Sequence, residues 1–194
     1  SRSNAYNSLA SMTEKGAAYL VEEASTRKYV PVPLNEFCKN RIRKLEESGK
    51  WLQEHMPTEK AYVEGYITIE GAENILNKIK NLLSQVDQRV YISCTRNYLL
   101  LLIRELDTLM EERKKVVIIT DQPATFHNAK VYFGENRGMQ IGIIADSKYV
   151  LTGEYGEGSM NTCLYSGQKN FVELYKTALA NEIKLLSIRE ENKD

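Results

Sequence analysis

The stretch that decides the fold is SRSNAYNSLASMTEKGAAYLVEEASTRKYVPVP, which occupies residues 1–33. Its first half predicts a helix over residues 4–15, because apolar and aromatic side chains recur there at a spacing of three and four. Gly16 then ends the helix, as expected of a residue that tolerates a positive φ. The rest predicts two short strands, residues 18–22 and 28–32, joined by a polar hairpin tip.

A helix, a glycine and a hairpin with a basic tip resemble the recognition helix and wing of a winged-helix DNA-binding domain. Polar side chains crowd the start of the helix, where a recognition helix meets base edges, and basic side chains at the tip can reach phosphate. An ordinary helix and hairpin in a small α+β domain is the alternative. A winged helix has two helices before its recognition helix, so we expect residues 1–33 to be the C-terminal part of such a domain. The candidate DNA-binding residues are Arg2, Ser3, Asn4, Tyr6, Asn7, Arg27, Lys28 and Tyr29.

The 194 residues carry no net formal charge, with 26 Lys and Arg against 26 Asp and Glu. No global basic field therefore draws the chain to nucleic acid, and DNA affinity would have to come from a local surface and from dimerisation. The three cysteines and two histidines lack metal-ligand spacing, so we expect no metal and no cofactor. The cysteines are scattered without a disulfide pattern, and the sequence shows no signal peptide and no long apolar run. We therefore expect a cytoplasmic protein without a membrane partner.

Residues 34–55 predict a long helix that Pro57 stops. Along this helix a set of positions steps alternately by four and three, which is the spacing of a coiled-coil seam. The seam predicts a homodimer joined partly through this helix, and a helix that packs on its own domain is the alternative. The seam residues are Cys38, Ile42, Leu45, Gly49, Leu52 and Met56.

The chain then alternates strand, helix, strand, helix, strand, which is typical of an α/β sheet. We expect strands at residues 61–70, 89–94 and 116–120, separated by helices at 72–86 and 98–114. The strand VVIIT is a continuous apolar run, as expected of a strand that is covered on both faces.

Short strands are expected next at residues 130–133, 139–145 and 149–153, with a tight turn between the last two. Residues 154–161 form a glycine-rich segment without the Lys-Ser/Thr ending of a phosphate-binding loop, so we expect a surface loop there. A closing helix is expected at residues 170–188.

These last strands resemble the core of the phospholipase D fold, whose active members carry His-x-Lys, four residues, Asp, six residues and Gly-Ser/Thr. Asp146 and Gly153 have this mutual spacing, but Met139, Ile141 and Glu154 stand at the His, Lys and Ser positions. Met and Ile can neither accept a phosphoryl group nor bind phosphate. The resemblance therefore implies the fold without the activity, and a phospholipase D-type phosphodiesterase is the alternative from another functional class.

The chain as a whole resembles the TrmB-like transcriptional regulators of archaea and bacteria. SRSNAYNSLASMTEKG, STRKYVPVP and FCKNRIRKLE resemble that family's recognition helix, wing and linker, and ENILNKIKNLLSQVDQRVYIS is similar to the start of its effector domain. The resemblance implies a homodimer that binds operator DNA and responds to a small molecule, often a sugar. The sugar-binding members carry a further C-terminal β domain that contacts the sugar, so no sugar contacts are carried over here. A scaffold that only dimerises is a third interpretation.

Ligands of open α/β sheets bind beyond the carboxyl ends of the strands, where loops converge. Hydroxyls, carboxylates and an arginine follow the strands at 89–94, 116–120 and 149–153, and they predict a pocket for a small polyol or a sugar phosphate. The alternative is that these polar groups only cap helices and turns. The candidate effector-binding residues are Ser93, Thr95, Arg96, Asp121, Glu154 and Tyr155.

The sequence therefore predicts an α/β protein in three parts. Residues 1–33 are the C-terminal part of a winged-helix domain, residues 34–57 are a linker and dimerisation helix, and residues 58–194 are a phospholipase D-like effector-binding domain. The predicted function is that of a DNA-binding transcriptional regulator that is not an enzyme.

Overall fold

The computed structural model describes residues 2–23, 26–56, 65–124, 126–135, 137–158 and 160–191. The chain divides into two compact units, Ser1–Lys60 and Ala61–Asp194, which we describe separately. The long helix that the sequence sets apart as a linker belongs by its contacts to the first unit.

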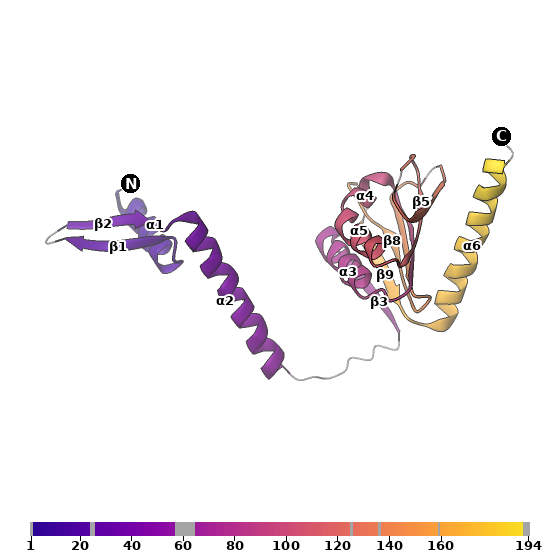
Figure 1. Ribbon diagram of the computed structural model, residues 1–194. Coiled ribbons are helices and arrows are strands. Elements are labelled where there is room, and N and C mark those ends of the chain that lie inside the picture. Colours follow the sequence, from indigo (N-terminus) through magenta and orange to yellow (C-terminus); the bar gives the residue numbers. More distant parts are fainter. Residues whose placement is uncertain are drawn as a thin grey trace. The chain divides into compact units, whose positions relative to one another are not determined.

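The first unit begins with α1 (Arg2–Glu14), followed by an antiparallel hairpin of β1 (Ala18–Glu23) and β2 (Thr26–Pro31) (Figure 1). Gly16 ends α1 with a φ of +73°, a conformation that a residue with a Cβ adopts at a cost. The predicted helix, glycine stop and hairpin are therefore confirmed; β1 begins at Ala18 as predicted, and the other ends are shifted by one or two residues.

The helix α2 (Leu34–His55) completes this unit, and both of its predicted ends are confirmed. None of its side chains is buried in the described part of the chain. Leu45 and Leu52 of the predicted seam are 73% and 47% exposed. The seam thus lies open along the helix.

The second unit is built on a seven-stranded sheet in the order β3-β9-β8-β7-β4-β5-β6. β4, β5 and β6 pair in parallel, whereas β7 pairs antiparallel with β4, and β8, β9 and β3 continue the antiparallel half. The strands are β3 (Tyr66–Glu70), β4 (Arg89–Ser93), β5 (Lys115–Thr120), β6 (Ala129–Phe133), β7 (Gln140–Ala145), β8 (Tyr149–Glu154) and β9 (Thr162–Ser166).

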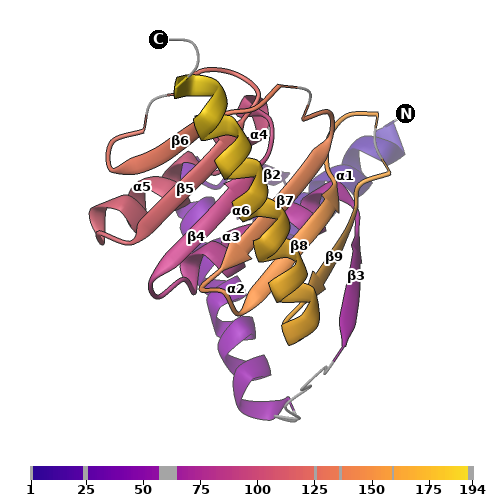
Figure 2. The same cartoon turned by 90° about the vertical axis from the view of Figure 1, so that its right-hand side faces the viewer.

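Helices cover both faces of the sheet. α3 (Ala72–Ser84), α4 (Arg96–Leu100) and α5 (Ile103–Glu111) lie on one face, and α6 (Lys169–Glu191) crosses the other (Figures 1 and 2). Residues 116–119 of β5 are all apolar. Successive side chains of a strand point to opposite faces of the sheet, and both faces are covered here. Val116 and Ile118 pack in the core beneath α3 and α5, while Val117 and Ile119 pack in the core beneath α6. The expectation of a strand covered on both faces is confirmed.

The single helix predicted over residues 98–114 is wrong, because two separate helices stand there. At the break, the backbone N–H of Leu101 bonds to the carbonyl of Tyr98, and that of Leu102 bonds to the carbonyl of Leu99. These tighter i→i−3 turns let both Leu99 and Leu102 enter the core, where an unbroken helix would set them farther apart around its axis.

Two further differences concern strands. β9 was not predicted, because its sequence TCLYS carries hydroxyl side chains at both ends and resembles a loop. β9 nevertheless pairs with β8 on one side and with β3 on the other. The strand predicted at residues 61–70 is observed as β3, and residues 61–64 lie outside the described residues.

Candidate functional site

The start of α1 presents the side chains that were predicted to contact bases. Ser3, Asn4 and Asn7 are exposed, and Tyr6 is 56% exposed. The side chain of Arg2 lies outside the described residues. This end of the helix therefore offers amide and hydroxyl groups to a partner, and an Asn amide can pair with adenine in bidentate fashion.

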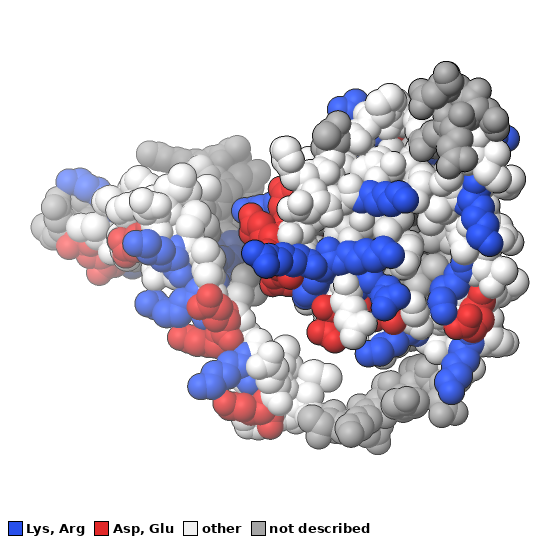
Figure 3. Space-filling model, turned by 45° about the vertical axis from the view of Figure 1, so that its right-hand side comes forward, with Lys and Arg blue, Asp and Glu red and all other residues white. Residues whose placement is uncertain are grey.

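The hairpin carries the residues predicted to contact phosphate. Arg27 is paired across the hairpin with Glu22, with 3.1 Å between Nε and Oε1. Both side chains are more than half exposed, so this ion pair contributes little stability and a phosphate can replace the carboxylate. Lys28 is exposed and Tyr29 is half-buried. On the face of the first unit seen in Figure 3, basic and acidic side chains lie side by side.

A contact that the sequence did not predict ties the hairpin to α2. The hydroxyl of Tyr19 donates to Oε1 of Glu36 at 2.5 Å. This hydrogen bond to a carboxylate raises the pKa of Tyr19 above its usual value. The side chains lie 17 positions apart in the sequence, and no periodic pattern connects them.

In the second unit, Asp146 and Ser147 form the turn between β7 and β8 with φ values of +49° and +55°. The tight turn predicted here is confirmed. The Asp146 carboxylate accepts three backbone hydrogen bonds, from Asp87 at 2.8 Å, Gln88 at 2.8 Å and Arg89 at 2.9 Å. Burial alone would raise the pKa of this carboxyl, but the three N–H donors and Lys148 outweigh it and hold the pKa below its usual value.

The remaining positions of the phospholipase D motif lie in different surroundings. Ile141 is 2% exposed and belongs to the core beneath α3 and α5, whereas Met139 is 38% exposed. Glu154 is exposed at the end of β8, opposite Gln140 of β7. A Cβ on Gly153 would collide with the backbone of β9 at Thr162, so this position requires glycine for packing.

The predicted effector residues do not all meet in one place. Ser93 and Glu154 both line a cavity of about 390 Å³ between the sheet and α6. Asp121 instead accepts a hydrogen bond from the backbone N–H of Arg96 at 2.8 Å. This is the capping role that was the alternative to ligand binding. Thr95 precedes α4 and its side chain makes no capping hydrogen bond. None of Thr95, Arg96 and Asp121 lines the cavity.

Tyr155 lies within the core rather than in the cavity. It is 6% exposed, and its ring meets that of Tyr98 edge to face with 4.9 Å between the ring centroids. Burial raises the pKa of its hydroxyl. The prediction that Tyr155 stacks on a ligand failed because Tyr155 continues the alternation of β8 on the face of Leu151, and both side chains pack in the core beneath α3 and α5.

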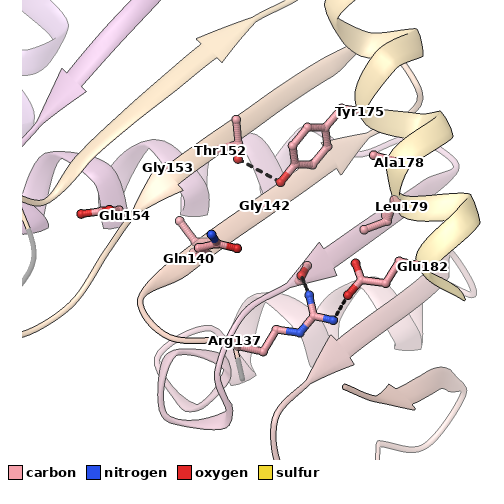
Figure 4. Close-up of a pocket in the computed structure, with 12 residues that line it drawn as sticks. Arg137, Gln140, Gly142, Thr152, Gly153, Glu154, Tyr175, Ala178, Leu179 and Glu182 are labelled. Atoms are coloured by element: carbon pink, nitrogen blue, oxygen red, sulfur yellow. Dashed lines mark hydrogen bonds and ion pairs between the residues drawn. The ribbon is translucent and has the colours of Figure 1, made fainter. Parts of the chain in front are cut away.

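The cavity beneath α6 contains side chains that sequence analysis missed (Figure 4). Arg137 donates to the Ser93 hydroxyl at 2.5 Å and forms an ion pair with Glu182 of α6. The hydroxyls of Tyr175 and Thr152 lie 2.9 Å apart. Arg137 follows β6 in a segment whose glycines predict only a loop, so nothing in the local pattern indicates that tertiary packing buries it.

A second hollow of about 470 Å³ adjoins the first and shares Arg137, Gln140 and Glu154 with it. Met139 also lines this second hollow. Met139, which the sequence resemblance places at the histidine position, therefore lines a hollow next to the cavity beneath α6.

Two of the free cysteines, Cys94 and Cys163, are buried. Burial, together with the charge of Asp121, raises the pKa of Cys94 to about 12, although Arg137 acts against the shift. Burial raises the pKa of Cys163 to about 11. Among the described residues, no three His, Cys, Asp or Glu side chains are grouped to hold a metal ion.

Comparison with solved structures shows what this arrangement resembles. TrmBL2, described as an archaeal chromatin protein with a novel mode of DNA binding, matches with a TM-score of 0.54 at 17% identity over 92% of this chain and 80% of that chain. NucT from Helicobacter pylori matches at 0.48 with 16% identity over 62% of this chain and 97% of that chain. Nuc from Salmonella typhimurium, a phospholipase D family member, also matches at 0.48, with 10% identity over 60% and 92%.

No family model matches the sequence, and a search of curated proteins finds no significant match. At these identities the structures show likeness of fold alone. The chain has the predicted α/β fold class, with a helix and hairpin, a long helix and a seven-stranded sheet covered by helices, and it resembles TrmBL2 in fold. Among the described helices, none has the length and apolar character needed to cross a membrane.

Proposed function

We propose that this protein is a homodimeric, DNA-binding transcriptional regulator whose phospholipase D-like domain is catalytically inactive and senses a small molecule. The observation that carries the proposal is the exposed polar start of α1, followed at once by a glycine stop and a hairpin. A helix that presents Asn4 and Asn7 can read base edges while the hairpin meets the backbone. TrmBL2, which shares the fold over most of its length, is itself described as binding DNA.

Dimerisation is part of the proposal because one small module with balanced charge binds DNA weakly. A twofold pair presents two recognition helices to two half-sites. The open seam of α2 is the surface that we assign to this contact, since its apolar side chains have no cover within their own unit.

The proposal that the domain is inactive rests on the side chains at the motif positions. A methionine thioether at residue 139 cannot form the covalent phosphoryl intermediate, and Ile141 has no charge with which to bind phosphate. Asp146 is committed to backbone hydrogen bonds at the opposite end of β7 from Met139. We place the effector in the two adjoining hollows at the strand ends.

The salt dependence of binding to duplex DNA tests the proposal for the intact protein. Arg27→Ala and Lys28→Ala should each weaken binding to all sequences and lower the slope of log K against log salt by about 1. Glu22→Ala is the matched control, because it removes the carboxylate that competes for Arg27 and should leave affinity unchanged or raise it. If Arg27→Ala changes neither the affinity nor the slope, the hairpin is not in contact with phosphate.

A further inference from the structure

The cavity beneath α6 is lined by residues of the loop before β7, of the strands β4, β7 and β8, and of α6. The loop before β7 supplies Arg137, the strands supply Ser93 and Thr152, and α6 supplies Tyr175 and Glu182 (Figure 4). At about 390 Å³ its volume falls in the range of pockets that hold small molecules.

The fold holds this space open by specific contacts. Gly142 has no side chain, and a Cβ there would collide with the ring of Tyr175, whose hydroxyl instead reaches Thr152. At the other end the Arg137–Glu182 ion pair joins α6 to the loop before β7. Between these two contacts α6 presents the side chains of Ala178 and Leu179, which both line the cavity (Figure 4).

The charges around the cavity discriminate between kinds of ligand. Arg137 is the single lysine or arginine among its lining residues, its side chain is 10% exposed, and it is already engaged by Ser93 and Glu182. With Glu154 included, the lining carries one positive and two negative groups, a formal charge of −1. A phosphate ester would meet two carboxylates and an arginine whose two terminal nitrogens are engaged by Ser93 and Glu182. Only the buried Nε of Arg137 has no partner among the described residues, and one N–H donor does not offset the two carboxylates, so an anion is disfavoured.

A cationic ligand finds no better partner. The Glu182 carboxylate is engaged by Arg137, and Glu154 is exposed to water, where an ion pair contributes little. The other polar groups are the hydroxyls of Ser93, Thr152 and Tyr175 and the amide of Gln140. Each of them can both donate and accept a hydrogen bond, which is the chemistry that a ligand hydroxyl complements.

We propose that the cavity beneath α6 binds a small, uncharged molecule with several hydroxyl groups. The assignment rests on the proposed function only for calling that molecule an effector, since binding itself needs no DNA. The site differs from the one predicted from sequence, because Thr95, Arg96, Asp121 and Tyr155 take no part in it and Arg137, Gln140, Thr152, Tyr175 and Glu182 do.

Calorimetric titration of the intact protein tests this assignment, with myo-inositol, D-glucose and maltose as uncharged probes, glucose 6-phosphate as the anion and glucosamine as the cation. Saturable binding is required, because polyols at high concentration stabilise any protein by exclusion from its surface. We expect at least one uncharged probe to bind saturably and more tightly than the phosphate ester and the amine.

Two matched variants locate the binding. Ala178→Leu places extra methyl groups in the cavity and should weaken binding about tenfold or more, whereas Ala180→Leu makes the same change on α6 at an exposed position that does not line the cavity and should leave it unchanged. Gln140→Leu, which removes an amide at the rim, should also weaken binding. Binding that survives Ala178→Leu, tighter binding of the charged probes, or no saturable binding of any uncharged probe would each overturn the proposal. A failure of DNA binding would not change the results expected for Ala178→Leu, Ala180→Leu and Gln140→Leu, because ligand binding itself needs no DNA.

Discussion

The carboxylate of Asp146 accepts the backbone N–H of Gln88 at 2.8 Å, joining residues that lie 58 positions apart. With the N–H groups of Asp87 and Arg89, this contact fixes the segment that leads from α3 into β4 against the turn between β7 and β8. Asp146 also stands at the Asp position of the spacing that resembles phospholipase D. Its three hydrogen bonds give it a structural role in the fold.

Replacing Asp146 should therefore lower stability. Asp146→Asn keeps the size of the side chain but turns an NH₂ group toward backbone donors, and we expect the free energy of unfolding at neutral pH to fall by about 1–3 kcal/mol. Because the folded-state pKa of Asp146 is lowered, this stability is present above the unfolded pKa of about 3.9 and is lost as pH falls through the folded value.

Urea unfolding at neutral pH and at progressively lower pH measures the effect. The difference between the wild type and Asp146→Asn should shrink in the acid range. Asp87→Asn makes the same substitution on an exposed neighbour whose contribution is its backbone N–H, and it should have little effect. An Asp146→Asn protein as stable as the wild type at neutral pH would show that the three hydrogen bonds do not matter.

The seam of α2 gives a second prediction, which concerns assembly. Leu45→Asp combined with Leu52→Asp places two charges in an apolar interface and should convert the dimer to monomers in sedimentation velocity at micromolar concentration. Asn40→Asp combined with Lys50→Asp adds acidic side chains to the same helix off the seam, and this variant should stay dimeric. A dimer that persists in the first variant would place the interface elsewhere.

The third prediction concerns turnover of a phosphodiester. The intact protein should not hydrolyse bis-p-nitrophenyl phosphate above the buffer rate, since no side chain at position 139 can take the phosphoryl group. Restoring the motif by Ile141→Lys should destabilise the protein rather than create activity, because that side chain is 2% exposed and packs in the core. Hydrolysis that is present in the wild type and absent from Met139→Ala would contradict this account.

Much of the fold follows from local pattern, and the exceptions have physical causes. The apolar run of β5, the helix α2 and the Gly16 stop are each dictated within a few residues, by two-sided burial, by helical periodicity and by a positive φ. The break at Leu101 and the strand β9 depend on packing and on pairing partners far along the chain, which no local window contains.

The site divides in the same way. Ser93 and Glu154 were found because strand ends are where ligands of such sheets gather. Arg137 was not found from the sequence. This loop arginine is buried by tertiary contacts, because β4 brings Ser93 to it and α6 brings Glu182. Tyr155 was misassigned because it continues the alternation of β8 on the same face as Leu151, and the sequence does not say which face of the sheet carries the cavity.

The central claim is that α1 reads DNA sequence. The most direct measurement selects binding sites for the intact protein from random duplex DNA, and then compares affinities for a selected and a scrambled duplex. Asn4→Ala and Asn7→Ala should each lose about 1–3 kcal/mol on the selected duplex and almost nothing on the scrambled one, while Asn81→Ala on α3 should match the wild type on both. If no sequence is selected, or if both α1 variants keep the wild-type preference, α1 does not read the DNA and the account is wrong.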